Sequence, residues 1–381
     1  MGNLTPWKQG GRYKKIFLKG EIIMRKLALL LGSLLVVASA SAKEVVPAPV
    51  VVEEAPVQVI EKEVIVYRDK EEGFRPNGYV DLQYRWYGET EGQKGTDLGW
   101  AAETNYSRTQ LQGKINMTEK QALEYRIRKY NLTSTVHEGI TDGKYGSDTR
   151  LRYFYNHGNL GDSKVNFTSR LHYRDRGDIA GAQELEYQAR FNFAEYMFNN
   201  DFIKTTNFVV APKYKYVWGI GNDKDYDNRL GFDIASFHEL PYGFSFELNF
   251  YVDQHFYGED QSFDAGRKEK DKNFTVDMEA YLYNTTNLYT NGNVSVDFNF
   301  EGGYDAYNWS QEKKFGTDKD ENAKYSLYAL PTIQVNYQAT PNVKVYAAAG
   351  AEYRNWAVEG NSEASHWRWQ PTVFAGFRTS F

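Results

Sequence analysis

The sequence predicts an all-β protein: a transmembrane, antiparallel, up-and-down β-barrel of about 14 strands with an N-terminal periplasmic extension. Three observations carry this prediction. The chain begins with a secretory signal pattern, it alternates apolar and polar residues in place of long apolar runs, and its connections alternate between short and long. Its 381 residues would also fit two soluble domains, so length alone does not decide the class.

A signal-peptide pattern lies near the N-terminus. Met24-Arg25-Lys26 is basic, Leu27 to Val37 is an apolar run, and Ala40-Ser41-Ala42 supplies the small residues of a cleavage site. We therefore expect a signal peptide at 24–42, with cleavage between Ala42 and Lys43. The apolar run is too short for a stable membrane span.

Two further segments flank the signal. Residues 1–23 fit no targeting pattern and are interpreted as a misassigned upstream start, with a genuine long n-region or cloning residues as the alternatives. Residues 43–75 are rich in Pro, Val and Glu, as in Val46-Pro-Ala-Pro-Val50, which favours an extended chain. We expect a flexible periplasmic leader there; contact with the cell wall or with neighbouring protomers is the sharper alternative.

Composition agrees with an exported protein whose strands have one wet and one apolar face. Mean hydropathy is −0.65, too polar for a helical membrane protein, yet aromatic residues make up 16% of the chain. After the signal there is no other apolar run near the roughly 20 residues that a transmembrane helix requires. Cysteine is absent, and a net charge of −5 gives no reason to expect a nucleic-acid partner.

Period-two alternation fills residues 76–381, the predicted barrel domain. Between Phe244 and Asp253, for example, large apolar residues alternate with Ser, Glu, Asn and Asp. The last stretch, Trp367 to Phe381, alternates in the same way and ends on an aromatic residue. A strand of this kind, with Phe377 and Phe381, resembles the signal that the barrel-assembly machinery reads in outer-membrane proteins. The alternative is an amphipathic edge strand of a soluble sandwich.

The connections between the alternating segments differ in length in a regular order. We expect short turns near Thr118, Gly158, Glu239 and Ala339, and long loops at 88–103, 135–147, 257–272 and 304–323. Short turns on one side and long loops on the other are typical of outer-membrane barrels, and an even strand count places both chain ends in the periplasm. Pro331 falls within a strand, where we expect a local bulge.

Strand parity assigns the charged residues of the alternating segments to the lumen. We expect them to form two facing walls of opposite charge, which would impose an electric field across the lumen. The alternative is that they only solvate a wet wall, which Glu124, Glu184 and Glu186 within the basic half partly support. The basic positions are Arg108, Lys114, Arg126, Arg128, Arg150, Arg152, Lys164, Arg170, Arg174, Arg190, Lys213 and Lys215. The acidic positions are Asp233, Glu247, Asp253, Asp277, Glu279, Asp297 and Glu301.

Catalysis is not predicted. An outer-membrane hydrolase needs a nucleophile and a base on adjacent strands, and of the six histidines only His172 lies firmly in mid-strand, where we interpret it as a pore-lining residue beside Arg170 and Arg174. We expect no catalytic residues, no cofactor and no metal. Acidic loop positions such as Glu259-Asp260 are interpreted as solvated charge, with cation binding as the alternative.

Six stretches of the chain carry a resemblance to a known family: Met24–Ser33, Lys43–Pro47, Val64–Arg68, Arg75–Gly78, Lys164–Phe167 and Phe193–Phe198. They resemble the major outer-membrane porin family of fusobacteria, over almost the whole length from Met24. The resemblance implies a homotrimeric, voltage-gated general diffusion porin in contact with outer-membrane lipid. It also implies loops that adhere to other bacterial or host cells, so a surface adhesin or structural barrel is the alternative function.

Overall fold

A computed structural model describes eight segments of the chain, all C-terminal to the predicted signal peptide. They are residues 73–91, 105–131, 146–176, 181–219, 226–263, 268–312, 327–356 and 366–381. The predictions for residues 1–23, the signal peptide 24–42 with its Ala42/Lys43 cleavage, and nearly all of the extension 43–75 lie outside these segments.

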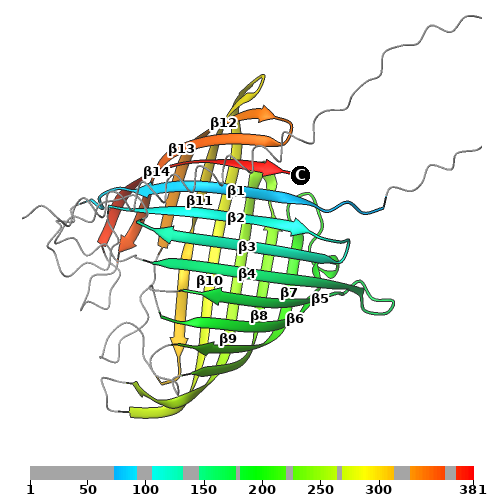
Figure 1. The fold of residues 1–381 in the computed structure, drawn as a ribbon, viewed down its shortest axis with the longest axis vertical. Coiled ribbons are helices and arrows are strands. Elements are labelled where there is room, and N and C mark those ends of the chain that lie inside the picture. The colour runs from blue at the N-terminus through cyan, green and yellow to red at the C-terminus, as the bar shows by residue number, and fades with distance from the viewer. Residues whose placement is uncertain are drawn as a thin grey trace, which may run out of the picture. The chain divides into compact units, whose positions relative to one another are not determined.

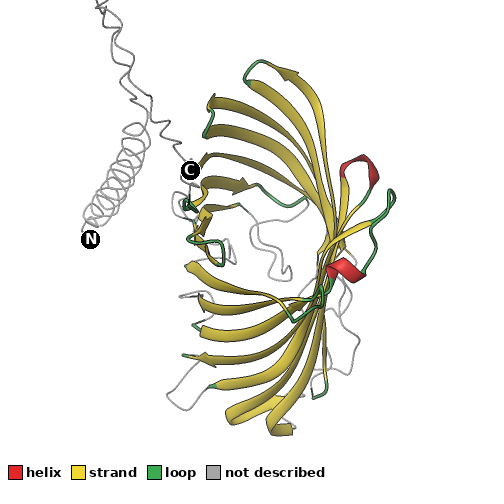
Figure 2. Cartoon of the chain, turned by 90° about the vertical axis from the view of Figure 1, so that its right-hand side faces the viewer, coloured by secondary structure: helices red, strands yellow, loops and turns green. Residues whose placement is uncertain are grey.

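Fourteen strands form a closed antiparallel barrel, which confirms the predicted fold class. Each strand pairs with its neighbours in sequence, and β14 pairs with β1 to close the ring (Figure 1). Figure 2 shows the strands curving around a common interior. The bounds are β1 Asn77–Tyr87, β2 Tyr106–Asn116, β3 Gln121–Tyr130, β4 Ser147–Asn159, β5 Asn166–Asp175, β6 Gln183–Asn192, β7 Lys204–Trp218, β8 Asp227–Glu239, β9 Phe244–Phe263, β10 Lys268–Asn291, β11 Val294–Ser310, β12 Leu327–Thr340, β13 Val343–Trp356 and β14 His366–Ser380.

The C-terminal residue takes part in closing the barrel. Backbone N–H of Gly78 donates to the carbonyl of Phe381 over 3.0 Å, and the N–H of Phe381 donates back to Gly78 over 3.1 Å. Register then runs from Tyr79 opposite Ser380 to Tyr87 opposite Thr372. Since every strand has a partner on both sides, the backbone polar groups along the ring are satisfied within the sheet.

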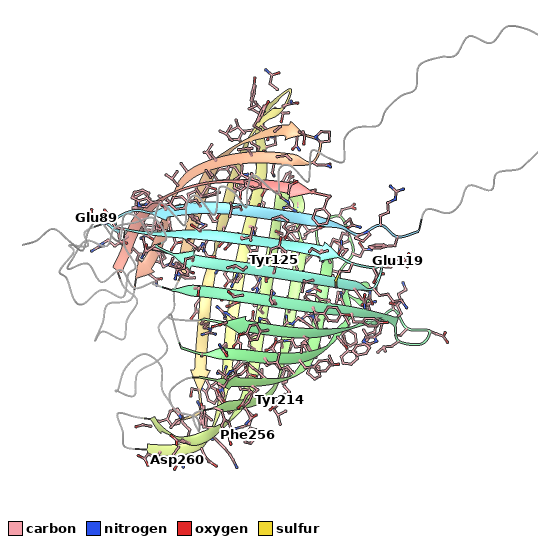
Figure 3. The ribbon with its side chains drawn as sticks, viewed as in Figure 1. Glu89, Glu119, Tyr125, Tyr214, Phe256 and Asp260 are labelled. Carbon is pink, nitrogen blue, oxygen red and sulfur yellow. The ribbon has the colours of Figure 1, made fainter. Side chains whose placement is uncertain are left out.

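The two ends of the barrel carry different connections. At one end the strands are joined by short turns, such as 117–120 between β2 and β3 and 341–342 between β12 and β13. Two short 3-10 helices, η2 (Ala194–Tyr196) and η3 (Pro241–Gly243), also belong to connections at this end, and none of the helices in the described segments is long and apolar enough to cross a membrane. Figure 3 shows Glu119 at the short-turn end and Glu89 at the opposite end.

The predicted bounds of two long loops are wrong in part. Strand β9 continues to Phe263, and strand β10 begins at Lys268. Most of the segment 257–272 is therefore strand. In the same way β11 extends to Ser310, inside the predicted loop 304–323. The extensions of β9 and β10 are mostly polar on both faces, which removes the alternation that marks a strand in sequence, while their backbone groups still pair.

The expected bulge at Pro331 is also wrong. Pro331 lies opposite Phe300 in an unshifted ladder between β11 and β12. Toward β13 the register is the same on both sides of it, with Ala329 opposite Tyr353 and Thr332 opposite Gly350. Proline has no N–H to donate, so the β12–β13 ladder lacks pairs at this position, and no extra residue is inserted.

Candidate functional site: the inner wall of the barrel

Burial in this barrel is the reverse of burial in a soluble protein. Leu171, Leu230 and Val373 are 47%, 53% and 49% exposed, whereas Gln188 and Thr372 are 0% and 1% exposed. Soluble domains bury apolar side chains and expose polar ones. The apolar residues of the alternating strands therefore cover the outside, and the polar residues are directed inward.

Contacts between strands that are not neighbours identify the inner face. The Lys213 ammonium on β7 reaches Asp253 on β9 over 2.9 Å. Arg85 on β1 and Tyr283 on β10 line one cavity although four strands separate them around the ring. Side chains meet in this way only on the concave side of a closed sheet, so residues of this parity face the lumen.

Six arginines cover the inner face of β3, β4 and β5, and we call this set the arginine wall. Asp148 bridges two of them: it accepts from Arg126 over 3.2 Å and from Arg174 over 2.9 and 3.0 Å. Arg170 donates to Glu186 over 2.6 Å. The members of the arginine wall are Arg126, Arg128, Arg150, Arg152, Arg170 and Arg174.

A different pattern repeats along the arc from β9 through β13 to β1, where four tyrosines each donate to a carboxylate. We call these four pairs the tyrosine wall. The pairs are Tyr251 with Glu279 at 3.0 Å, Tyr283 with Glu247 at 3.0 Å, Tyr328 with Glu301 at 2.7 Å, and Tyr346 with Asp81 at 2.8 Å.

Glycine makes one of these contacts geometrically possible. Gly376 on β14 lies opposite Tyr346, and a Cβ at this position would come within 2.6 Å of the tyrosine hydroxyl. Without a side chain on Gly376, the ring extends across β14 and reaches Asp81 on β1. This is the reason a strand interior tolerates glycine here.

Between the two walls, lysines of β7 form ion pairs with carboxylates of β6, β8 and β9. Lys213 contacts Asp233 at 2.6 Å and Asp253 at 2.9 Å, and its side chain is 2% exposed. Lys215 contacts Glu186 at 3.1 Å and Glu184 at 3.8 Å. Full pairing is what a cation needs in order to be buried at this depth.

The residues assigned to the lumen from sequence lie on inward-facing strand positions, with one exception. Lys164 is in the 160–165 turn between β4 and β5, at the short-turn rim, and not on a strand. Elsewhere on the inner face, Lys114 pairs with Glu124 at 3.7 Å, and Asp297 accepts from Asn336 over 2.6 Å. Arg190 donates to Gln188 over 2.7 Å, and Arg108 lies over the ring of Tyr87.

Sequence reasoning missed the partners of these charges. Asp148, which neutralises two arginines, and Asp81, which accepts from Tyr346, were not assigned to the lumen. Their parity carried the signal, because Asp81 alternates with Val80 and Leu82, and Asp148 lies two residues before Arg150 on the same face of its strand. The four tyrosine donors were obscured, since tyrosine occurs on both faces of this barrel and its parity alone predicts no partner.

One hydrogen-bonded chain includes a histidine that sequence analysis did not single out. His255 Nδ1 lies 2.9 Å from Asp227, and Nε2 lies 3.0 Å from the hydroxyl of Thr275. Asp227 also accepts from Arg229 over 2.7 Å. The order carboxylate, imidazole, hydroxyl is that of a nucleophilic triad, but His255 is 7% exposed and the chain joins β8, β9 and β10 side by side. We interpret it as a buried polar network that holds these strands together.

Comparisons with known proteins give distant similarities in fold. No model of a protein family matches the chain, and no curated protein matches it in sequence. Among solved structures it is similar to a bacterial polysaccharide outer-membrane secretin, with 11% identity, a TM-score of 0.36, and coverage of 80% of this chain and 97% of the other. It is also similar to OmpT, an outer-membrane protein of Vibrio cholerae in its trimer form, with 9% identity, a TM-score of 0.35, and coverage of 81% and 99%.

An anion-selective porin from Comamonas acidovorans is a third example. Identity is 9%, the TM-score is 0.30, and the match covers 81% of this chain and 99% of the porin. None of these similarities identifies the family of this chain.

Proposed function

We propose that the protein is a porin of the bacterial outer membrane, through which ions and small hydrophilic solutes diffuse passively. The observation that carries this proposal is the inverted burial: a closed barrel of fourteen strands with an apolar exterior and a charged, hydrogen-bonded interior. An apolar exterior is stable only in contact with lipid, and a closed ring leaves no unpaired strand edge in the hydrocarbon.

The strand number supports an aqueous path. Barrels of about eight strands are filled by their own side chains, whereas barrels of about sixteen leave a water-filled channel. Fourteen strands are closer to the second case. Inner-face cations also retain contact with solvent: the side chains of Arg174 and Arg229 are 27% and 26% exposed.

Charge on the inner wall favours hydrophilic solutes. The arginine wall and the acidic residues of β8 to β11 belong to different arcs of the ring. A low-dielectric barrel wall focuses the field between such groups, and dipolar solutes would align in it. Bulky apolar solutes would be disfavoured because they displace water from charged groups.

Several finer features form part of the proposal. We place the N-terminus and the extension 43–75 in the periplasm, with the short turns, and we expect three copies to assemble as a homotrimer. Phe377 and Phe381 would provide the signal that the barrel-assembly machinery reads. Membership of the fusobacterial porin family is proposed on the sequence resemblance. Enzymatic activity, a cofactor and a nucleic-acid partner are not part of the proposal.

The adhesin alternative depends on the long connections at the end opposite the short turns. Much of 88–103, 135–147 and 304–323 lies outside the segments that the structure describes. Adhesion through these loops is compatible with a conducting barrel, so it stays a prediction beside the porin function.

Recording from planar lipid bilayers tests the proposed function. Purified, refolded protein should produce stable unitary steps in ionic current, with conductance that rises with salt concentration. Such steps would exclude a closed barrel that does not conduct. Their absence from correctly folded protein, verified by its resistance to unfolding in detergent, would overturn the porin assignment.

A further inference from the structure

Three arginines of the arginine wall lie directly opposite one another across neighbouring strands. Arg126 on β3 pairs in register with Arg150 on β4, and Arg150 pairs with Arg174 on β5. Arg152, two residues further along β4, faces the same way. Like charges directly opposite in a sheet destabilise it, so the row needs compensating negative charge.

The carboxylates near the row compensate only part of it. Asp148 serves Arg126 and Arg174 together. Glu186 serves Arg170 and is shared with Lys215, which lies at 3.1 Å. Among the residues that the structure describes, no carboxylate lies within ion-pair distance of Arg150 or Arg152. Glu124, which lies opposite Arg152 in the β3–β4 register, forms an ion pair with Lys114 at 3.7 Å. Arg150 and Arg152 therefore lack a carboxylate partner of their own.

Hydrogen-bond donors at the same place lack acceptors. Within the described part of the chain, the Nε atoms of Arg126, Arg152 and Arg170 are buried without a hydrogen-bond partner. Neither ring nitrogen of His172 makes a hydrogen bond, although Nδ1 lies 3.7 Å from Glu186; the residue is only 6% exposed and lies opposite Arg152 in the β4–β5 register. Buried donors normally have hydrogen-bond partners. Their clustering beside Arg150 and Arg152 indicates that the missing component is a hydrogen-bond acceptor that carries negative charge.

We propose that Arg126, Arg150, Arg152 and His172 form a binding site for a multivalent oxyanion, of which phosphate is the simplest, on the path of a permeating solute. The inference rests on the proposed porin function and names a class of solute for it: small molecules that carry a phosphate or several carboxylates. Guanidinium groups present paired N–H donors that match the oxygens of such groups.

The site is suited to transient occupancy. Arg128, Arg170 and Arg190 continue the positive charge along the neighbouring strands, so an anion leaving one pair of donors meets the next. Conduction requires binding that is favourable enough for entry and weak enough for release. A row of overlapping weak sites satisfies both conditions better than one fully enclosed site.

Phosphate block of chloride current in planar bilayers tests the site. Inorganic phosphate is added at constant ionic strength to the wild type and to Arg150→Gln, Arg152→Gln and Arg378→Gln, with acetate as the monovalent control anion. Arg378 is the matched control cation, since it lies on β14 outside the arginine wall, stacked on Tyr79 at 3.7 Å. Calorimetric titration of phosphate into folded protein in detergent measures binding independently of conduction.

We expect phosphate, but not acetate, to reduce chloride current saturably. Loss of either Arg150 or Arg152 should raise the half-blocking concentration about tenfold, the change that corresponds to one charge-assisted hydrogen bond. The Arg378→Gln control should stay within about twofold of wild type. Arg150→Gln should also fold with unchanged or higher resistance to urea, because it removes like-charge repulsion; a merely structural arginine would show the opposite.

The outcomes separate this inference from the porin function. A conducting channel with no saturable phosphate block, or with equal block in all three variants, overturns the site and leaves the porin standing. Calorimetric binding that depends on Arg150 and Arg152 in a barrel that does not conduct supports the site and overturns the porin. Calorimetric binding that is absent, or unaffected by both substitutions, overturns the site whatever the conductance.

Discussion

The arginine wall and the tyrosine wall differ in the partners that they provide for charged side chains. In the tyrosine wall every carboxylate receives a hydroxyl hydrogen bond, at distances between 2.7 and 3.0 Å. In the arginine wall Arg126, Arg170 and Arg174 pair with Asp148 or Glu186, and Arg128 donates to Gln110. Arg150 and Arg152 have no carboxylate partner among the described residues. One arc of the barrel is internally satisfied, and the other depends on a partner from outside the chain.

The difference teaches that the partners of the charges, and not their number alone, distinguish the two walls. A carboxylate that accepts from a tyrosine hydroxyl has one of its acceptor sites already occupied. An arginine without a partner presents both its charge and its donors to a passing solute. The two arcs should therefore respond differently to substitution.

The largest effect is expected at the fully paired cation between the two walls. Replacing Lys213 with Met leaves Asp233 and Asp253 buried without their shared partner, which should lower the free energy of unfolding by about 3–5 kcal/mol. Lys204→Met on the same strand is the control, because its ion pair with Glu239 is more than half exposed and should contribute at most about 1 kcal/mol. Urea titration of both variants measures the difference, and equal losses would contradict the burial of the Lys213 cluster.

The next effect concerns the two faces of one strand. Leu248 and Asn249 are adjacent on β9, with Leu248 outside and Asn249 inside. Leu248→Arg should destabilise the folded barrel by about 2–4 kcal/mol if the position lies near the middle of the membrane, whereas Asn249→Arg should fold normally. Refolding into lipid vesicles provides the measurement, and equal tolerance of the two substitutions would refute the assignment of the faces.

A smaller effect is expected within the tyrosine wall. Tyr346→Phe removes the hydroxyl that donates to Asp81, which is 7% exposed, and should cost about 1–3 kcal/mol. Tyr353 lies on the same strand but faces outward, with its ring against Trp369 at 4.6 Å between centroids. Tyr353→Phe is therefore the matched control and should change urea stability little. A Tyr346 variant as stable as the control would mean that the carboxylate does not depend on its tyrosine.

Much of this architecture follows from sequence alone, for a physical reason. In a barrel between lipid and water, alternation determines which face each side chain occupies, so parity assigns Arg126, Arg150 and Asp277 to the face opposite the apolar residues. Where both faces are polar, as between Tyr257 and Lys272, alternation disappears and the strands are missed. The ion-pair partners of the charged residues were also missed. The pairing of Asp148 with Arg174 depends on strand register and side-chain reach, and parity gives no information on either.

The central claim is that the two charged arcs line one conducting path, and ion selectivity tests it most directly. The reversal potential is measured in a salt gradient for the wild type and for two multiple variants in which charged residues are replaced by Gln or Asn. Neutralising the basic set should move the reversal potential toward cation selectivity, and neutralising the acidic set should move it toward anion selectivity. If neither set changes the reversal potential of a conducting channel, these side chains do not line the path and the account is contradicted. The basic set is Arg126, Arg128, Arg150 and Arg152, and the acidic set is Asp277, Glu279 and Asp297.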